Sequence, residues 1–596
     1  MFSKTTVGYS NIMFKKISLF IILQLLLFIT ISCDHKPDPG LDDKLKFDKQ
    51  EFVDQIKLSF STIDSLDIIK KSLDDKFDTL KYIYSKRNYE PFIIESFNSK
   101  SKIDSILIIL GNAYEHGLNA EMYDYSIIKN KVKEIFGDYT RADDKVNINL
   151  LAISEILLTN AVLKFSEHMR HGVVNPRKLY PEVYYLPVND SLNQKYFEPL
   201  EQKNIVTYLQ NIQPKSEKYK KLQTELLKFE KLKEIYYPHI AVTENKIEIG
   251  NESALLKNIY QKLIVFGFID TSKTKLSISI IYDSTLSPFI KEFQRANGLI
   301  ANGVIGKPTI ERLNITPKEY VEKIKLNLER FRWINYSDTA KYIVVNIPDF
   351  KLYAVENEIE KFDIKICTGR KTTWETPNLY GQISYFVLNP TWSVPRSIID
   401  EEIVSGLRRD SSYLKKRNFV AYKSGKQVSL NGLTAQELAA NRYSLVQNPG
   451  AGNALGKIKF MFNNPFGVYL HDTPTRAPFS YVNRAVSHGC MRVEKPMQLA
   501  EYFLSNNSNW TLDYLKIEIG QKVENQTVVE EYKSKRSELR KNSSYGITTE
   551  VKLDKYVPLF VDYYTVWVDK DGKLNYRDDV YGRDKKLKES LFTINK

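Results

Sequence analysis

The sequence predicts a multidomain α+β protein, and three observations support this fold class. With 596 residues the chain is too long for a single hydrophobic core, so three to five domains are expected. Residues 46–237 are dominated by apolar positions at helical spacing, whereas residues 342–471 hold the short alternating or apolar runs typical of strands. Hydrophobic residues make up 42% and charged residues 27% of the chain, a composition that excludes a fibrous or disordered protein.

The N-terminus has the pattern of an export signal. Two lysines precede an apolar run, Ile17–Ile31, that leads into Cys33. The run has about 15 residues, fewer than the roughly 20 that a spanning helix needs. Its end, T-I-S-C, resembles a bacterial lipobox, which implies that Cys33 is lipidated; a signal anchor without lipid is the alternative. We expect a signal peptide at residues 1–33 and a tether at residues 34–45.

Residues 46–245 are predicted to form a helical scaffold domain. Ile153, Leu157, Ala161 and Phe165 recur every four residues and therefore share one face of a helix. No cluster of residues with catalytic potential occurs in this region, so a structural role is expected.

A compact unit is predicted at residues 250–315, followed by a helical connector at residues 316–338. Asn302 and Gly303 are a turn signal, and Gly306 permits a close approach before the next helix. Together with the neighbouring F-Q, G-L, T and L positions, the unit resembles the small three-helix peptidoglycan-binding module. The resemblance predicts the fold, while glycan binding itself stays open.

The pattern then changes to strands, and residues 339–520 are predicted to form a mostly-β domain. Residues 399–456 are expected to be a partly helical insertion within it. Residues 457–462 and 467–471 are expected to pair as a hairpin across N-N-P-F. Residues 521–596 are expected to be a C-terminal extension that packs on the scaffold.

Charge and cysteine content restrict the possible partners. The formal charge of +14 suits anionic partners, but it is spread along the chain, so no nucleic-acid partner is predicted. The three cysteines, Cys33, Cys367 and Cys490, fit neither a disulfide framework nor a zinc ribbon. Cys367 lies in an apolar strand pattern and is expected to be inert.

A cysteine-centred site is predicted where V-Y-L-H-D-T-P-T-R is followed by S-H-G-C-M-R-V-E. His471 lies in the first segment, and Cys490 follows His488 and Gly489 in the second. A thiol attacks as its thiolate, which a nearby imidazole produces at neutral pH. His471 can be this base, held by a backbone carbonyl, and the amides of Gly489 and Cys490 are expected to bind an oxyanion. This pattern indicates acyl transfer through a thioester.

Two other interpretations of the same residues stay open. His471, His488 and Cys490 could be zinc ligands, although Arg492 would raise the electrostatic cost of a cation there. A buried cysteine with two hydrogen-bonded histidines would need no function at all.

The motifs also resemble a known family. Four motifs resemble those of the L,D-transpeptidase catalytic domain (YkuD type). They are H-D-T-P, S-H-G-C-M-R, N-P-T-W-S-V-P at 389–395 and N-P-G-A-G-N-A-L-G-K-I-K-F-M-F at 448–462. The likeness is strongest to the large HDTP-type branch with scaffold and peptidoglycan-binding domains, and it covers nearly the whole mature chain. It implies a capping subdomain at 399–456, a Cys490 nucleophile and His471 as general acid and base.

The resemblance also implies a substrate and a location. His488 is expected to support the site, and Arg492, Trp392 and Tyr469 to contact the substrate, without metal or cofactor. The reaction would be 3→3 cross-linking of peptidoglycan stem peptides, with release of the terminal D-alanine, at the periplasmic face of a bacterial envelope membrane. The alternatives are an L,D-carboxypeptidase, in which water resolves the thioester, and a cell-wall-binding lipoprotein without catalytic activity.

Overall fold

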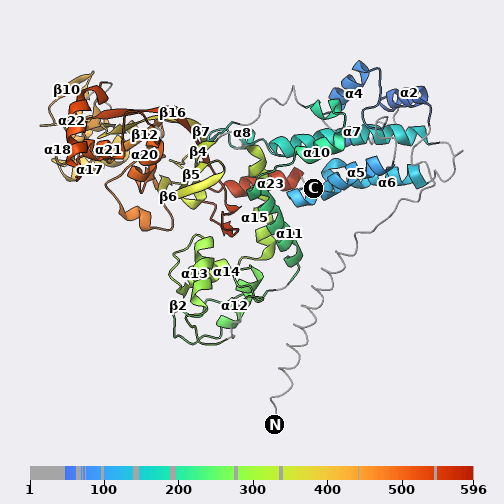
Figure 1. Ribbon diagram of the computed structural model, residues 1–596, viewed down its shortest axis with the longest axis horizontal. Coiled ribbons are helices and arrows are strands. Elements are labelled where there is room, and N and C mark those ends of the chain that lie inside the picture. The colour runs from blue at the N-terminus through green and yellow to red at the C-terminus, as the bar shows by residue number, and fades with distance from the viewer. Residues whose placement is uncertain are drawn as a thin grey trace, which may run out of the picture.

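Figure 1 shows the computed structural model, which describes residues 47–61, 69, 71–73, 76–94, 100–137, 146–187, 196–235, 237–273, 279–334, 340–440, 442–505, 507–541 and 547–594. A helical domain and a β-rich domain lie at opposite ends of the molecule, and a small module extends from the junction between them. The predicted lipidation site, Cys33, lies outside the described residues.

Helix α7 (Ile148–His171) is the core of the scaffold domain. It begins after Asn147, whose side chain accepts a hydrogen bond from the Leu150 amide, and it ends at Gly172 with a φ of 81°. Among the described helices, α7 alone is long and apolar enough to cross a membrane, but 83% of its apolar window is buried inside the protein. The surrounding helices are α2 (Lys49–Ser59), α4 (Phe77–Lys86), α5 (Lys100–Gly111), α6 (Tyr125–Gly137) and α10 (Ile205–Asn211).

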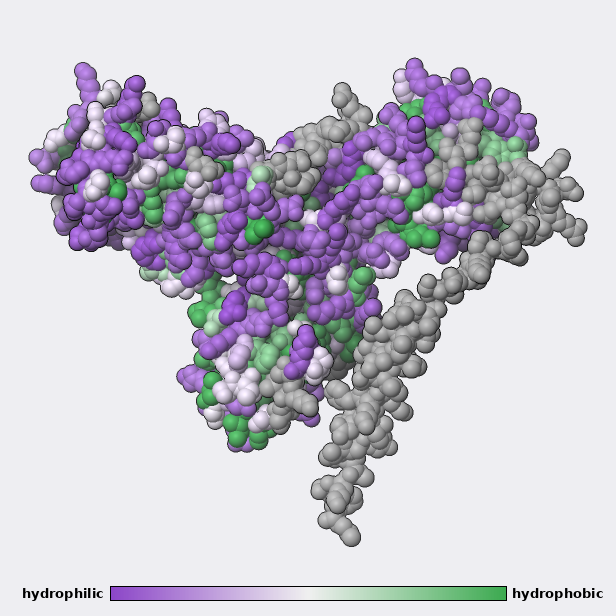
Figure 2. All heavy atoms as spheres, viewed as in Figure 1, coloured by the Kyte–Doolittle hydropathy of each residue, from purple (hydrophilic) through white to green (hydrophobic). Residues whose placement is uncertain are grey.

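A small module follows helix α11 (Glu217–Leu232). Its elements are β2 (Lys246–Ile247), α12 (Leu256–Val265), α13 (Ser287–Ala296), β3 (Ile305–Gly306) and α14 (Lys307–Leu313). The Gly303 amide donates to the Gln294 side chain at 2.9 Å, with a φ of 83° at Gly303 that favours glycine. Figure 2 shows hydrophobic surface at the tip of this module. The exposed apolar residues of the module include isoleucines 249, 280, 281 and 300. That it binds peptidoglycan stays a prediction.

Helix α15 (Pro317–Trp333), predicted as a connector, is buried at the centre of the molecule. Tyr320 and Leu328 belong to the core of the module, whereas Leu326 and Trp333 belong to the core of the scaffold. The helix therefore joins the hydrophobic cores of two domains and is more than a link between them.

The β-rich domain is organised around one sheet that closes on itself. The strand order is β1-β7-β12-β13-β15-β6-β5-β4-β16, and β16 also pairs with β7. The strands are β1 (Tyr184–Tyr185), β4 (Lys341–Asn346), β5 (Lys351–Glu356), β6 (Ile359–Gly369), β7 (Asn378–Leu388), β12 (Ile458–Phe462), β13 (Leu470–His471), β15 (Met491–Val493) and β16 (Thr549–Asp562), with β14 (Ala485–Ser487) paired to β6. Helix α20 (Pro496–Leu504) packs against this domain's core.

The segment between β7 and β12 forms a unit with its own sheet and core. Its sheet has the order β10-β9-β11-β8, from β8 (Trp392–Ser393), β9 (Phe419–Lys423), β10 (Lys426–Val428) and β11 (Ser444–Gln447), and its helices include α17 (Val404–Arg409) and α19 (Ala435–Ala439). The predicted start of the insertion at residue 399 is too late, because β8 pairs with β11 and Val394 lies in the unit's core.

The predicted end of the β domain at residue 520 is wrong. Strand β16 lies between β4 and β7, so residues 549–562 are part of the main sheet. The extension also reaches the scaffold through helix α23 (Arg583–Ile594), whose Leu587 and Leu591 are buried in the scaffold core. The sequence separates β16 from β4 by about 200 residues, so local patterning could not reveal this pairing.

The contribution of β16 can be measured. Leu559 is fully buried and pairs with Ile343 on β4 and Gly381 on β7. Leu559→Ala should lower the free energy of unfolding by roughly 2–5 kcal/mol, because it leaves a cavity in the core. Tyr556→Ala, on the same strand but 61% exposed, is the control and should change it by about 0.5 kcal/mol or less. Equal effects of the two substitutions in urea unfolding would contradict this role of β16.

Candidate active site

Two short strands bring the predicted catalytic residues together. Strands β13 and β15 pair in parallel, with Leu470 opposite Met491 and His471 opposite Arg492. Leu470 and Met491 are fully buried in the core of the β domain. Because side chains alternate along a strand, His471 and Arg492 lie on the other face of the sheet. Cys490 directly precedes β15, and its thiol lies close to Tyr469, Lys459 and Arg492.

The geometry of His471 fixes its protonation state. The ring is 5% exposed, and Nδ1 lies 2.5 Å from the carbonyl oxygen of Asp472. A carbonyl only accepts hydrogen bonds, so Nδ1 carries the proton and Nε2 has a free lone pair. Burial lowers the pKa of His471 to about 3, and the charges of Arg492 and Lys459 act in the same direction. His471 is therefore neutral and able to accept a proton at neutral pH.

The neighbouring carboxylate does not take part in this contact. Asp472 accepts the Lys457 amide at 2.8 Å and is 3.3 Å from the Arg476 guanidinium. Gly456, with a φ of 62°, passes so close to Asp472 that a Cβ there would lie 2.3 Å from the carboxylate. Asp472 thus anchors the start of β12, and only its backbone carbonyl orients His471.

Cys490 is protonated in the resting site. Burial raises the pKa of its thiol, whereas hydrogen bonds from Tyr469 and the positive charges of Lys459 and Arg492 act in the opposite direction. A neutral thiol beside a neutral imidazole is a pair in which proton transfer accompanies nucleophilic attack.

Sequence reasoning missed Lys459. It lies on β12 opposite His471, and its Nζ is 3.8 Å from the centre of the Tyr469 ring. Burial lowers the pKa of Lys459, and the nearby Cys490 raises it. Within the described ranges, neither Lys459 nor Arg492 has an ion pair or a hydrogen bond from its charged group. The alternation in K-I-K-F could have revealed that Lys459 faces away from the core.

Of the predicted substrate-binding residues, Tyr469 adjoins Cys490, and Trp392 in turn adjoins Tyr469. Burial raises the pKa of Tyr469, with the charge of Cys490 and a hydrogen bond to it acting the same way, whereas a hydrogen bond from Trp392 acts in the opposite direction. Trp392 lies on β8, so the separate unit between β7 and β12 reaches the site through this side chain. Whether the unit covers the site during the reaction stays a prediction.

His488 lies near the site but faces other groups. Its Nε2 is 2.7 Å from the Arg370 guanidinium and 3.4 Å from carboxylate oxygens of Glu401 and Glu402. Its ring also meets the Trp374 ring edge-on at 5.2 Å. Its outer nitrogen is therefore occupied away from Cys490. Across the part of the chain that the structure describes, no group of three His, Cys, Asp or Glu side chains is arranged to hold a metal ion.

The turn before the nucleophile corrects one expectation. The Gly489 amide donates to the Ser487 hydroxyl at 3.2 Å, and that hydroxyl donates to the Cys490 carbonyl at 2.5 Å. The Gly489 amide is therefore engaged and is not a free oxyanion donor, contrary to the sequence-based expectation. The Cys490 amide has no acceptor among the described residues. Gly489 has a φ of 103°, a conformation that L side chains rarely adopt.

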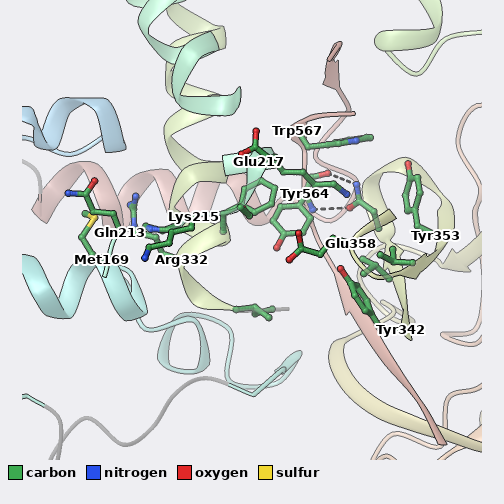
Figure 3. Close-up of a pocket in the computed structure, with 18 of the residues that line it drawn as sticks. Met169, Gln213, Lys215, Glu217, Arg332, Tyr342, Tyr353, Glu358, Tyr564 and Trp567 are labelled. Carbon is green, nitrogen blue, oxygen red and sulfur yellow. Dashed lines mark hydrogen bonds between the residues drawn. The ribbon is translucent and has the colours of Figure 1, made fainter. Parts of the chain in front are cut away.

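A separate cavity of about 700 Å³ lies at the junction of the domains (Figure 3). It is lined from α7, α11, α15, β4 and β5, with Tyr342, Tyr564 and Trp567 along one side. Lys218 of α11 forms an ion pair with Glu360 of β6 at 2.5 Å at this junction. None of the predicted site residues lines this cavity, so it is distinct from the cysteine site.

The protonation state of the site predicts its pH dependence. Because burial raises the pKa of Cys490, iodoacetamide should alkylate it with a midpoint above the ordinary cysteine value. Lys459→Met should move the midpoint of alkylation further upward, because it removes a positive charge that favours the thiolate. Lys426→Met, on the exposed strand β10, is the control and should leave the midpoint unchanged. Mass spectrometry of the Cys490 peptide against pH measures both. A midpoint below the ordinary value would contradict the protonated resting state.

Two parts of the chain match known protein families. Residues 340–530 match the profile of the L,D-transpeptidase catalytic domain (YkuD), and residues 78–226 match that of the Scaffold domain. A Haemophilus influenzae protein named "Putative L,D-transpeptidase" is 28% identical over 325 residues, 53% of this chain and 59% of the relative. The match thus spans less than two thirds of that relative's length.

Two solved structures are also similar. An L,D-transpeptidase from Stackebrandtia nassauensis shares 16% identity over 44% of this chain and 91% of its own, with a TM-score of 0.20. One from Xylanimonas cellulosilytica shares 14% identity over 45% of this chain and 94% of its own, with a TM-score of 0.15. At such TM-scores the family assignment depends on the sequence matches. Residues 340–530 therefore match an L,D-transpeptidase catalytic domain, and residues 78–226 match the Scaffold domain that precedes it in this chain.

Proposed function

We propose that the protein cross-links peptidoglycan stem peptides in the 3→3 mode through a thioester on Cys490. The main support is the parallel pairing of β13, which ends at His471, with β15, which directly follows Cys490, together with the contact between His471 Nδ1 and the Asp472 carbonyl. The residues required for acyl transfer, a nucleophile, a base and a free backbone donor, then lie within one small region of the sheet.

The reaction would proceed in two balanced steps. Cys490 Sγ attacks the carbonyl carbon between diaminopimelate and the terminal D-alanine, and its proton passes to His471 Nε2. The C–N bond breaks, and D-alanine leaves with that proton on its amine. The amine of a second stem peptide then attacks the thioester, loses a proton to His471, and the thiolate leaves and is reprotonated. One amide bond is broken and one is formed.

Lys459 and Arg492 fit an anionic substrate. Both are partly buried on the site face, and neither has a partner for its charge among the described residues. A buried cation without a counter-ion is costly, so a carboxylate brought by a ligand would stabilise the site. Stem peptides carry such carboxylates, and the +14 charge of the chain is compatible with them.

Hydrolysis is the main alternative outcome. If water reaches the thioester, the same residues make an L,D-carboxypeptidase. If the unit that carries Trp392 covers the thioester, exclusion of water would favour transfer over hydrolysis. A wall-binding protein without activity is the non-enzymatic alternative, and the arrangement of His471 and Cys490 argues against it.

Muropeptide analysis tests the proposal. Purified protein incubated with tetrapeptide-bearing sacculi should produce 3→3 dimers, and Cys490→Ala should produce none. His471→Gln should reduce the rate by about 10²–10⁴-fold through loss of the base. His488→Gln is the matched control and should cost less than about tenfold, because its Nε2 faces Arg370. Tripeptides alone would indicate hydrolysis. Unchanged muropeptides would reject both the transpeptidase and the carboxypeptidase activity.

We also propose that Cys33 is lipidated and holds the protein at the periplasmic face of an envelope membrane. The support is the sequence of the N-terminal segment alone: a basic start, the apolar run Ile17–Ile31 and the T-I-S-C end.

Metabolic labelling with an alkyne-tagged fatty acid tests the anchor. The full chain should incorporate the label, and Cys33→Ser should lose it because the acceptor thiol is gone. Cys367→Ser, which removes a cysteine that is buried in the β domain, should keep it. Labelling that survives Cys33→Ser would reject this anchor.

A further inference from the structure

We propose that Thr376 and Tyr581 are positioning residues that hold the Gly489–Cys490 peptide so that the Cys490 amide faces the oxyanion of the reaction. The inference rests on the proposed acyl transfer at Cys490. It adds two residues to the predicted site: Thr376 lies within the matched domain at residues 340–530, and Tyr581 lies beyond that domain.

Thr376 connects two backbone segments around the nucleophile. Its side chain is fully buried, and its Oγ1 accepts the Gly369 amide at 2.9 Å and donates to the Gly489 carbonyl at 2.8 Å. Tyr581 completes the arrangement, since its hydroxyl accepts the Thr376 amide at 3.2 Å and donates to the Gly369 carbonyl at 2.7 Å. Each hydroxyl therefore both donates and accepts, which leaves neither unpaired in a buried position.

The backbone segments at Gly369, Trp374 and Gly489 are packed so closely that no further side chain fits between them. A Cβ on Gly369 would lie 1.7 Å from the Trp374 carbonyl oxygen and 2.9 Å from the Gly489 Cα. The end of β6, the loop that carries Trp374 and the catalytic turn are thus in direct contact. Within this contact, Thr376 fixes the direction of one peptide group.

That direction decides where the Cys490 amide points. A trans peptide is planar, and its carbonyl and N–H point in opposite directions. The Gly489 carbonyl and the Cys490 N–H belong to the same peptide, so holding the carbonyl on Thr376 turns the N–H away from Thr376. Turning this peptide over changes ψ of Gly489 and φ of Cys490, and glycine restricts the backbone less than other residues. The hydrogen bond from Thr376 opposes that rotation. The Cys490 N–H, which has no acceptor in the described part of the chain, is then a free donor for an oxyanion.

The C-terminal segment holds Tyr581 in place. The Tyr581 amide donates to the Tyr563 hydroxyl at 2.7 Å, and that hydroxyl donates to Asp579 at 2.7 Å. Arg583 donates to the Thr376 carbonyl at 3.2 Å and to Glu375 at 3.1 Å. Residues 563–583, which follow β16, therefore support the catalytic turn.

Two reactions of the same thiol separate amide orientation from thiol reactivity. Acylation of Cys490 by p-nitrophenyl acetate forms an oxyanion, whereas alkylation by iodoacetamide displaces iodide without one. Thr376→Val should slow acylation by roughly 10- to 100-fold, somewhat below the loss seen when an oxyanion donor is removed, and leave alkylation within about twofold. Tyr581→Phe should slow acylation less, and Thr376→Ser, which keeps the hydroxyl, should restore most of the rate. Cys490→Ala supplies the background for both reagents.

Tyr180→Phe is the matched control. The Tyr180 hydroxyl donates to the Arg583 carbonyl at 2.6 Å, so this substitution removes a buried hydrogen bond of the same C-terminal segment without touching Thr376 or Gly369. It should lower Tm about as much as Tyr581→Phe and leave acylation unchanged. Acylation by Thr376→Val at the wild-type rate, or a parallel loss of alkylation, would overturn the inference. Wild-type protein that acylates but makes no cross-link would instead refute the proposed function and leave this inference standing.

Discussion

Strands β13 and β15 contain only two and three residues, yet the chemistry of the site depends on their parallel pairing. Parallel neighbours place residues from separate parts of the chain in register, and here the pairing of Leu470 with Met491 puts His471 beside Arg492 on the opposite face. A shift by one residue would turn His471 into the core. Leu470 and Met491, both fully buried, make that shift unfavourable, so the packing of the core selects the geometry of the site.

The larger architecture depends on buried charges in and around α15. Glu329 and Arg332 form an ion pair at 2.6 Å with no exposed side-chain surface, and Glu329 also accepts the Val174 amide at 2.8 Å. Arg330 reaches Asp584 of α23 at 2.6 Å. Removing one partner of such a pair leaves an uncompensated buried charge, at roughly 3–5 kcal/mol. These contacts join the scaffold, α15 and the C-terminal segment, which in turn carries Tyr581 to the catalytic turn.

Local patterns in the sequence predicted the helices and the strand pairs that form between neighbouring segments of the chain. The helix over residues 317–333 and the pairing of β12 with β13 follow from periodicity and turn residues. The position of β16 could not be predicted, because strand partners 200 residues apart leave no local signal. Of the site, His471 and Cys490 were identified from residue type and motif spacing, and their roles stay predictions. The engaged amide of Gly489 was not predictable, because it depends on the rotamer of Ser487, and Thr376 acts only through folding that brings it to the turn.

In the proposed reaction Cys490 carries the acyl group and His471 carries the proton. Intact-protein mass spectrometry after rapid mixing with a tetrapeptide donor, without an acceptor amine, detects that acyl group. The mass should increase by the donor minus D-alanine on the Cys490 peptide, and the adduct should form far more slowly when His471 is replaced by glutamine. Release of D-alanine with no adduct on Cys490 at the shortest times would contradict this role. Continued release of D-alanine after Cys490→Ala would contradict it as well.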